Sequence, residues 1–325
     1  MREITSPYLL EEDKILQEEL RPKTLKEFIG KEKLKENIEV FIKSAKKRKS
    51  PLDHVLLSGP PGLGKTTLAH CISNEIGTEI IATSGPVIER PFDLAGILTK
   101  LKPMSILFID EIHRLPKNVE EYLYSAMENY EIDLIIDKGP GAKTIKFKLA
   151  PFTLIGATTR QGLLTGPLRS RFGINLRIDY YTNEEICEIL QRSAKILNIK
   201  SDKEGLYEIA KRSRGTPRIA NRLLKRVRDF AIVKGKGEID LEIAKYALNK
   251  MDVDEYGLDE MDKKIIETLY YKFHNRPVGL KTLALALDED EGTIEEVYEP
   301  FLIREGFIEK TARGRILTKK SIEIF

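Results

Sequence analysis

The chain has 325 residues, of which 41% are hydrophobic and 32% are charged, a composition typical of a globular protein with two or three domains. Its 54 Lys and Arg residues against 51 Asp and Glu residues leave a formal charge of +3, which excludes a uniformly basic nucleic-acid binder but permits a local basic patch. The amino-terminal segment is charged early, and no apolar run approaches membrane-spanning length. We therefore expect a cytoplasmic protein without a secretory signal, in which Cys71 and Cys187 are buried, reduced thiols.

The first 181 residues predict an α/β nucleotide-binding core that carries an irregular amino-terminal arm. A helix is expected over about residues 31–46. After it, short apolar strands alternate with helices, and such strands are typical of a parallel sheet that is covered on both faces. The strands are predicted at residues 54–58, 79–83, 105–110, 152–159 and 175–181.

After Thr182 the strand pattern stops. Four helical segments predict a small helical lid domain over residues 182–254, and an acidic linker follows it. Residues 255–325 show three helical segments and then two short extended runs, a pattern typical of a winged-helix domain that binds DNA.

The stretch GPPGLGKTTLAH, residues 59–70, contains the spacing G-x-x-x-x-G-K-[ST] at Gly59, Gly64, Lys65 and Thr66. A predicted strand precedes it and a predicted helix follows it, which is the context in which this pattern forms a phosphate-binding loop. Backbone N–H groups and the helix N-terminus then converge on phosphate oxygens. Lys65 is expected to reach the β- and γ-phosphates of ATP, and the Thr66 hydroxyl to ligate Mg²⁺.

Asp110 and Glu111 follow directly after a buried apolar strand, at the end where ligands bind in open α/β sheets. Asp110 is expected to hold the magnesium ion and Glu111 to orient the attacking water, which favours hydrolysis over phosphorylation of a substrate. Thr159 ends the fourth strand. Its hydroxyl could contact the γ-phosphate or the attacking water, or it could make a local turn bond, and the sequence leaves both open.

Two arginines lie where an anionic partner is expected. Arg171 follows the fourth strand in a loop, with Arg169 as a rival for its role. Thr216 and Pro217 predict the start of a helix, so Arg218 is placed in a first turn, where the helix dipole disfavours a cation. A γ-phosphate or a local carboxylate would satisfy such an arginine.

Residues 131–149 predict a β-hairpin with the turn KGPGAK. Ile145, Phe147 and Leu149 alternate with polar residues, which indicates a two-faced strand. On the other arm Ile135 interrupts the polar face. It could pack on a neighbouring loop or mark a docking surface.

The glycine loop, FIDEIHRL, GATTR, PLRSRFGI and GTPRIANRLLKRVRD together resemble the AAA+ ATPases. With RPKTLKEFIG, YEPFLIREGFIEKTARGR and the order of three domains, the likeness extends to the RuvB family of Holliday-junction branch-migration motors over residues 20–318. The resemblance implies a hexameric ring around duplex DNA at four-way junctions, with ATP hydrolysis at subunit interfaces in recombination and repair. It implies RuvA as the partner that binds the hairpin, and RuvC in a larger complex.

The resemblance also implies roles for individual residues. Thr159 matches the first sensor, Arg171 an arginine finger that acts on the neighbouring subunit, and Arg218 the second sensor. The hairpin residues Ile135 and Ile136 would contact RuvA, and Lys310 and Arg315 would contact DNA from the wing. The residues implied around the nucleotide are Leu20, Arg21, Gly62, Gly64, Lys65, Thr66, Thr67, Glu128, Asn129, Tyr130, Arg171, Tyr181 and Arg218.

Two other functions are compatible with an AAA+ core joined to a winged helix. One is a nucleotide-switched replication initiator that binds DNA, and the other is a clamp-loader subunit. The hairpin of residues 131–149, together with a complete catalytic set, favours the translocating motor over both.

Overall fold

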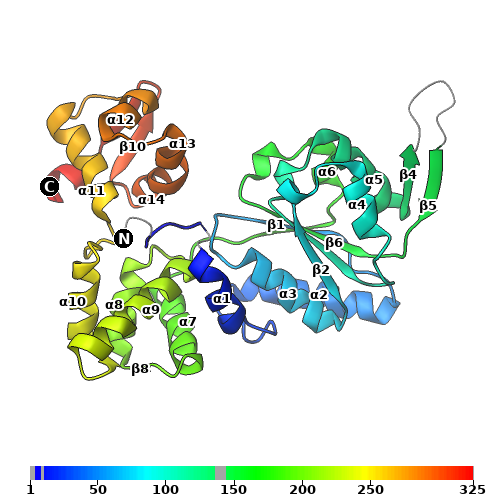
Figure 1. Cartoon of the computed structure of the whole chain (residues 1–325), viewed down its shortest axis with the longest axis horizontal. Coiled ribbons are helices and arrows are strands. Elements are labelled where there is room, and N and C mark those ends of the chain that lie inside the picture. Colours follow the sequence, from blue (N-terminus) through cyan, green and yellow to red (C-terminus); the bar gives the residue numbers. More distant parts are fainter. Residues whose placement is uncertain (1–3, 9–10, 136–143, 325) are drawn as a thin grey trace. The chain divides into compact units, whose positions relative to one another are not determined.

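The computed structural model describes residues 4–8, 11–135 and 144–324 (Figure 1). Its contacts divide the chain into two compact units, which are described separately: Arg21–Tyr180, and Met1–Leu20 together with Tyr181–Phe325. The sequence analysis attached the amino-terminal arm to the core, whereas the contacts group the arm with the later domains. Both cysteines are buried, as expected, and they form no disulfide.

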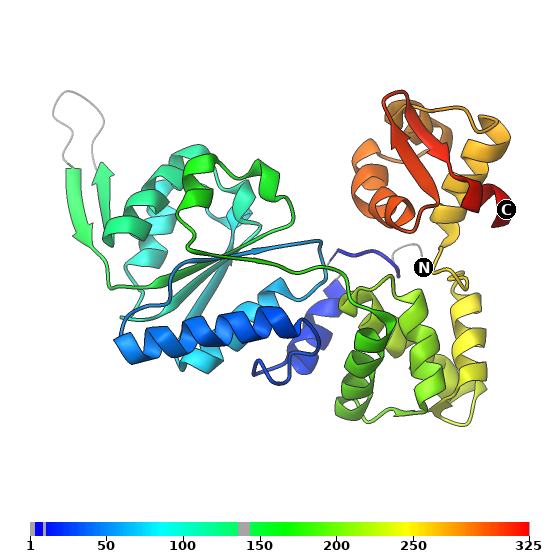
Figure 2. The same ribbon diagram turned by 180° about the vertical axis from the view of Figure 1, so that it is seen from behind.

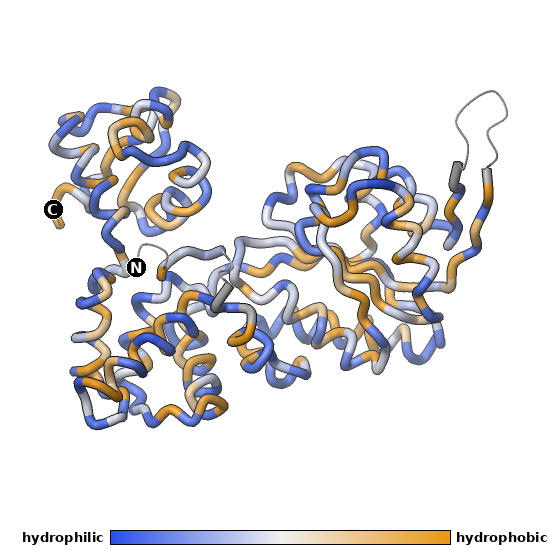
Figure 3. The backbone as a smooth tube through the Cα atoms, viewed as in Figure 1, coloured by the Kyte–Doolittle hydropathy of each residue, from blue (hydrophilic) through white to orange (hydrophobic). Residues whose placement is uncertain are grey.

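A five-stranded parallel sheet in the order β2-β3-β6-β1-β7 is the centre of the first unit, so the predicted α/β core with a parallel sheet is confirmed. Every residue of β1 and β6 is buried, as expected of strands covered on both faces. Figure 3 shows the hydrophobic colouring of the strands at the centre of this unit. Because β1 lies between β6 and β7, the loop that leaves β1 is flanked by the ends of two further strands. The strands are β1 Val55–Ser58, β2 Ile80–Ser84, β3 Ile106–Asp110, β6 Thr153–Thr158 and β7 Ile174–Arg177.

Helices cover both faces of this sheet. Figures 1 and 2 show α2 (Glu32–Arg48) and α3 (Lys65–Ile76) on one face, and α4 (Pro91–Leu98), α5 (Lys117–Asn129) and α6 (Gly166–Ser170) on the other. The helices α4 and α5 did not emerge from the sequence. They bury an apolar stripe, which includes Leu94, Val119 and Leu123, against the sheet residues Leu107 and Leu154. Short 3-10 turns follow three strands, at Gly85–Val87, Ile112–Arg114 and Gln161–Leu163.

The predicted hairpin is present as two antiparallel strands, β4 Glu131–Ile135 and β5 Thr144–Lys148. Ile132 lies opposite Phe147, and Leu134 opposite Ile145, so the apolar positions of the two arms share one face. Glu131, Asp133 and Ile135 oppose Lys148, Lys146 and Thr144 on the other face.

Four helices follow in the second unit, as predicted: α7 Asn183–Ile196, α8 Lys203–Arg212, α9 Pro217–Lys234 and α10 Leu241–Lys250. Side chains cap three of these helices. Thr182 and Glu185 form a capping box before α7, and Asp202 and Asp240 accept hydrogen bonds from the first turns of α8 and α10. A two-residue parallel pair, β8 Lys200–Ser201 with β9 Glu238–Ile239, closes the helical part.

The last part of the chain folds as the predicted winged helix around its own apolar core. The antiparallel pair β10 Ile308–Thr311 and β11 Gly314–Leu317 forms the wing. A final helix, α15 Lys319–Ile324, was not predicted. The remaining elements are α11 Glu260–Glu267, a π-helical turn Thr268–Lys272, α12 Leu280–Leu287, α13 Glu291–Thr293, a second π-helical turn Ile294–Tyr298, and α14 Glu299–Arg304.

Buried arginine contacts explain why the arm, with helix α1 (Glu11–Leu20), belongs to the second unit. Arg222 of α9 is 2% exposed, and its Nη2 lies 2.5 Å from Oδ2 of Asp13. The same guanidinium donates to the backbone carbonyls of Ile4, Ser6 and Tyr8. A planar, always-charged fork suits this arrangement of several acceptors.

A second buried arginine joins the helical part to the winged helix. Arg214, in the turn before α9, places Nη2 at 2.5 Å from Oδ2 of Asp262 and 3.2 Å from Oδ2 of Asp259. Its Nε donates to the Gly257 carbonyl at 3.0 Å, and its guanidinium carbon lies 4.1 Å from the ring centroid of Phe301. Burial, and to a smaller extent Asp259, raise the pKa of Asp262 to about 7, although Arg214 acts in the opposite direction.

This cluster predicts a pH-dependent stability. The pKa of Asp262 is raised in the folded chain, so its contribution is full below the unfolded pKa of about 4 and is lost as the pH rises towards about 7, by up to about 1.4 kcal/mol per pH unit. We expect the thermal unfolding midpoint of the wild-type chain to fall more between about pH 5 and about pH 8 than that of Asp262→Asn, which cannot ionise. Equal pH dependence in the two proteins would contradict the assignment.

Candidate active site

The loop between β1 and α3 has the backbone shape of a phosphate cradle. Gly59, Gly62 and Gly64 all have positive φ, at 143°, 78° and 96°. A Cβ at Gly59 would lie 2.1 Å from the carbonyl oxygen of Ile178, so only glycine fits there. The N–H of Gly59 donates to the Thr158 carbonyl at 3.2 Å, which ties the loop to β6. The loop leads directly into the N-terminus of α3, where an anion is stabilised.

Lys65 and Thr66 lie where the sequence predicts them. The ammonium of Lys65 donates to the carbonyls of Gly59 and Pro60 at 2.7 and 2.8 Å, and its side chain is therefore held over the loop. The Thr66 hydroxyl lies 3.2 Å from Oδ2 of Asp110. A hydroxyl and a carboxylate side by side fit Mg²⁺, which takes one or two protein oxygens and completes its shell with water and substrate phosphate. Accordingly, the described residues contain no cluster of three or more His, Cys, Asp or Glu side chains that could hold a metal without substrate.

Asp110 and Glu111 form a tight turn at the end of β3. The N–H of Glu111 donates to Oδ1 of Asp110 at 2.9 Å, and Glu111 has a positive φ of 48°, which is uncommon for a residue other than glycine. A Cβ at Gly85 would lie 2.4 Å from the Glu111 carbonyl oxygen, so the absence of a side chain at Gly85 makes room for this turn. The Glu111 side chain is 34% exposed and can meet a substrate.

Thr159 contacts the predicted catalytic carboxylate directly, because its hydroxyl lies 3.2 Å from Oε2 of Glu111. No role was predicted for His113 from the sequence. Its Nε2 lies 3.4 Å from the same carboxylate oxygen, and its Nδ1 lies 2.9 Å from the Thr158 hydroxyl. Burial lowers the pKa of His113, although Glu111 raises it, so the ring is neutral near pH 7. A signal was available, since FIDEIHRL places a histidine two residues after the glutamate.

Arg171 makes local contacts in the isolated chain. Its Nη1 donates to the Pro167 carbonyl at 2.8 Å, and its Nη2 lies 3.0 Å from Oε1 of Glu128. The guanidinium carbon also lies 4.4 Å from the ring centroid of Tyr124. The sequence analysis left open a pairing with a core carboxylate, and Glu128 makes that pairing here.

Glu128, Asn129 and Tyr130 lie at the opposite edge of the sheet from the phosphate loop. The carbonyl of the preceding Met127 is 3.0 Å from Nε2 of His54, which directly precedes β1. The phosphate loop leaves the other end of β1, about 15 Å away at about 3.3 Å per residue. The structure therefore does not bring this segment, or the Arg171 paired with it, to the same site as Lys65.

Three further predicted residues belong to the second unit. Leu20 is buried, and its carbonyl accepts a hydrogen bond from Arg192 at 2.7 Å. Tyr181 is also buried, which raises the pKa of its hydroxyl, and its N–H donates to Gly215 at 3.0 Å. Arg218 is in the first turn of α9 as predicted, and its Nη1 donates to the carbonyl of Pro7 at 2.7 Å. Arg21 belongs to the first unit, and Thr67 follows Thr66 in the first turn of α3.

The two wing residues that are predicted to contact DNA have different surroundings. Lys310 and Arg315 are directly opposed across β10 and β11. The Lys310 ammonium is half exposed and lies 3.0 Å from Glu295. Arg315 is 6% exposed, and two of its nitrogens, Nε and Nη2, bond the two carboxylate oxygens of Glu299. A DNA phosphate would have to displace this bidentate carboxylate, whereas the neighbouring Arg313 is exposed.

The hairpin exposes apolar side chains at described positions. Ile145 is 41% exposed and Phe147 is 37% exposed, although they lie on the apolar face of the hairpin. Of the two residues predicted to bind a partner, Ile136 lies outside the described residues. Ile135 is placed only as the last backbone position of β4.

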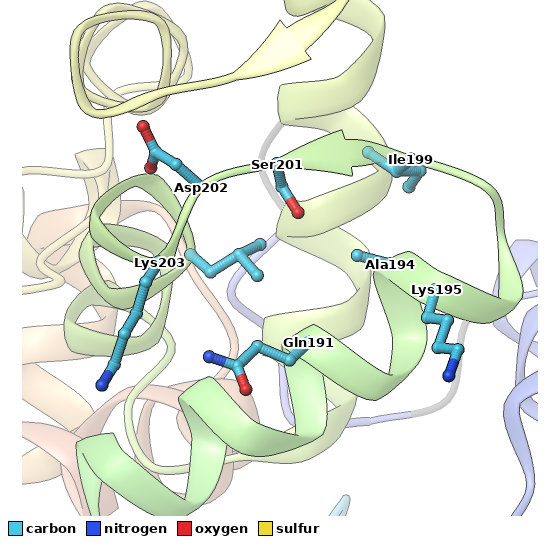
Figure 4. A pocket seen from close by; sticks show the side chains of 8 residues that line it. Gln191, Ala194, Lys195, Ile199, Ser201, Asp202 and Lys203 are labelled. Atoms are coloured by element: carbon cyan, nitrogen blue, oxygen red, sulfur yellow. The ribbon is translucent and has the colours of Figure 1, made fainter.

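A cavity of about 310 Å³ opens in the helical part of the second unit (Figure 4). It lies between the end of α7 and the start of α8, and it contains none of the predicted site residues. Its lining residues are Gln191, Ala194, Lys195, Ile199, Ser201, Asp202, Lys203 and Leu206.

Comparisons with known families match almost the whole chain. The model of the Holliday junction DNA helicase RuvB P-loop domain matches residues 20–178. The model of the RuvB AAA lid domain matches residues 181–254, and that of the RuvB C-terminal winged helix domain matches residues 255–325. None of the helices among the described residues is long and apolar enough to cross a membrane.

Individual relatives agree with these matches. The Holliday junction branch migration complex subunit RuvB of Salinibacter ruber is 60% identical over 306 residues, which cover 94% of this chain and 89% of the relative. The protein of the same name from Parabacteroides distasonis is 60% identical over 299 residues, which cover 92% and 88%. The solved structure of the Thermotoga maritima RuvB Holliday junction branch migration motor is 49% identical, with a TM-score of 0.83 over 94% of this chain and 98% of that chain.

The close approach of Gly85 to Glu111 yields a prediction at the catalytic turn. Gly85→Ala forces the Glu111 carbonyl to move, because the new Cβ would lie 2.4 Å from it, and we expect ATP hydrolysis to fall by about tenfold or more. Gly96→Ala on α4 is the matched control, since a Cβ there meets nothing within 4 Å. Steady-state ATPase rates of the two variants check this, and equal rates would contradict the positional role of Gly85.

Proposed function

The chain belongs to the RuvB family, and on this premise we propose that it is an ATP-driven motor that moves duplex DNA and drives branch migration of Holliday junctions in recombination and repair. The observation that carries the proposal is the complete hydrolytic set at one edge of the sheet. Lys65, Thr66, Asp110, Glu111 and Thr159 are linked there by the phosphate loop and by contacts of 3.2 Å. Such a motor in a bacterial cell works in the cytoplasm, and we propose that location.

We propose a step in ATP hydrolysis for each of these residues. The backbone of the phosphate loop and Lys65 bind the phosphates. Thr66 and Asp110 are the residues that would hold Mg²⁺, which neutralises charge on the β- and γ-phosphates when it is bound. Glu111 orients and polarises the attacking water, because its carboxylate is at the edge of the site and partly exposed. The Thr159 hydroxyl, at the end of β6, contacts the γ-phosphate.

The opposite edge of the sheet supports assembly into a ring. Arg171 and residues 128–130 are about 15 Å from the phosphate loop of their own chain, at about 3.3 Å per residue along β1. We propose that they complete the nucleotide site of a neighbouring subunit, where Arg171 stabilises the charge on the transferring phosphoryl group. Glu128 then pairs with Arg171 in the isolated chain, and Arg171 leaves this carboxylate to bind the nucleotide on assembly. A hexameric ring is the assembly that the family resemblance implies.

The exposed apolar face of the hairpin supports a protein partner. Ile145 and Phe147 lie on one face of the two-stranded arm and are both more than one third exposed, so together they form a small apolar surface of the kind that can mark a docking site. We propose that the hairpin binds RuvA through this face together with Ile135 and Ile136, and that RuvC joins the larger complex. The wing would contact DNA phosphates through Lys310 and the exposed Arg313, and through Arg315 if it releases Glu299.

A synthetic four-way junction tests the proposed function. We expect the chain with ATP and Mg²⁺ to separate such a junction into duplex products irrespective of its sequence, and RuvA to stimulate the reaction. Glu111→Gln should bind Mg·ATP and fail to migrate the junction, with ATP hydrolysis lowered about 10²–10⁴-fold, whereas Lys65→Ala should bind nucleotide weakly. Dependence on one DNA sequence would favour a replication initiator, and loading of a clamp without junction migration would favour a clamp loader.

Mixing two inactive variants tests the action of Arg171 on a neighbouring subunit. Arg171→Ala lacks the finger and Lys65→Ala lacks the phosphate lysine, so each should be inactive alone. In mixed rings an intact phosphate loop can lie beside an intact Arg171, and an arginine supplied by a neighbour can be worth about 10³–10⁵ in rate. We therefore expect part of the ATPase activity to return. Arg169→Ala, mixed in the same way, tests the rival arginine. Mixed rings that stay inactive at every ratio would contradict the role of Arg171.

A further inference from the structure

Two adjacent threonines at the end of β6 reach Glu111 by different routes. Thr159 touches the carboxylate directly, with its hydroxyl 3.2 Å from Oε2. Thr158 reaches it through His113, since the Thr158 hydroxyl lies 2.9 Å from Nδ1 and Nε2 lies 3.4 Å from the same Oε2. The end of β6 is thus connected to the carboxylate of Glu111 in two ways, directly through Thr159 and indirectly through Thr158 and His113.

The contacts of His113 favour one orientation and one tautomer of its ring. The Thr158 hydroxyl oxygen accepts the backbone N–H of Arg160 at 3.0 Å, so its own hydrogen is available to donate to Nδ1. When Nδ1 accepts that hydrogen, Nε2 carries the ring hydrogen and faces Glu111 with a donor rather than with a second lone pair. A neutral ring in this tautomer places its N–H donor 3.4 Å from Oε2 of Glu111, which is longer than an ordinary hydrogen bond.

His113 is also held rigidly. Its side chain is 6% exposed, and the 3-10 turn Ile112–Arg114 that carries it is anchored by the buried Ile112 and Leu115. The N–H of Arg114 donates to the Glu111 carbonyl at 2.9 Å, which closes the turn. A donor on such a support can fix the carboxylate of Glu111 without contacting substrate.

We propose that His113 is a positioning residue for Glu111, and that it holds the carboxylate in place when Thr159 turns to the γ-phosphate. The Thr159 hydroxyl has one hydrogen and cannot donate it to the carboxylate and to a phosphate oxygen at once. Glu111 therefore loses the Thr159 donor when Thr159 contacts the nucleotide, and Nε2 of His113, 3.4 Å from Oε2, is the donor that can then close on the carboxylate. The inference rests on the proposed role of Glu111 in hydrolysis.

Two substitutions at His113 separate positioning from packing. In His113→Gln the side-chain amide nitrogen can occupy the place of Nε2 and still donate to Glu111. In His113→Asn the shorter amide reaches only the place of Nδ1, so the contact with Thr158 survives and the contact with Glu111 is lost. We expect kcat to fall about 10–100-fold in His113→Asn, with KM and Mg·ATP affinity unchanged, and to recover largely in His113→Gln.

The route through Thr158 is tested with Thr158→Val and Thr158→Ser. The valine removes the hydroxyl at nearly constant volume, so we expect a lower kcat with unchanged nucleotide affinity, whereas the serine should retain the wild-type kcat. His274→Asn is the control for a histidine change, since His274 is exposed and lies in the other unit. Nucleotide affinity and the thermal unfolding midpoint show that each variant is folded.

A comparison in the Glu111→Gln background separates this inference from the proposed function. If His113 acts through Glu111, His113→Asn should lower the residual rate of Glu111→Gln little or not at all. Wild-type kcat in His113→Asn, or equal losses in His113→Asn and His113→Gln, would overturn the positioning role. Near wild-type hydrolysis by Glu111→Gln would instead overturn the role of Glu111 itself.

Discussion

The hydrogen bond from the Gly59 N–H to the Thr158 carbonyl is the contact on which the candidate site depends. It joins the phosphate loop, which leaves β1, to the last residue of β6. The backbone of Gly59 can approach so closely because it carries no side chain. A Cβ there would collide with the carbonyl of Ile178, the residue that follows β7. The phosphate loop, the end of β6 and the catalytic turn are therefore joined by direct contacts.

The carboxyl and amino ends of the sheet strands carry different predicted site residues. The carboxyl edge carries Lys65, Asp110, Glu111 and Thr159, which are the residues of the proposed hydrolytic site in the first unit. The amino edge carries Arg171 and Glu128, which pair with one another and are too far along β1 to serve the same nucleotide. This separation is the basis of the proposal that each chain contributes to two nucleotide sites and that a ring of subunits completes them.

Buried arginines give the second unit its internal connections. Arg222 holds the amino-terminal arm on α9, and Arg214 holds the first turn of α11 against the turn that precedes α9. Arg218, the proposed second sensor, lies between these two arginines in the chain and donates to a carbonyl of the arm. Each buried guanidinium is met by carboxylates and carbonyls, which is the condition under which a charge is tolerated in a protein interior.

The sequence by itself determined the parallel sheet, the four lid helices, the winged helix and the residues of the phosphate loop and of the catalytic turn. These follow from local signals: apolar runs, glycines at fixed spacing, and acids at a strand end. The helices α1, α4, α5, α6 and α15 were missed. Only the tertiary structure decided that His113 faces Glu111, that Glu299 binds the wing's Arg315, and that Glu128 and Arg171 lie away from the phosphate loop. Those facts depend on which segments meet across the sheet and across the wing, and pairings between distant residues leave no local pattern in the chain.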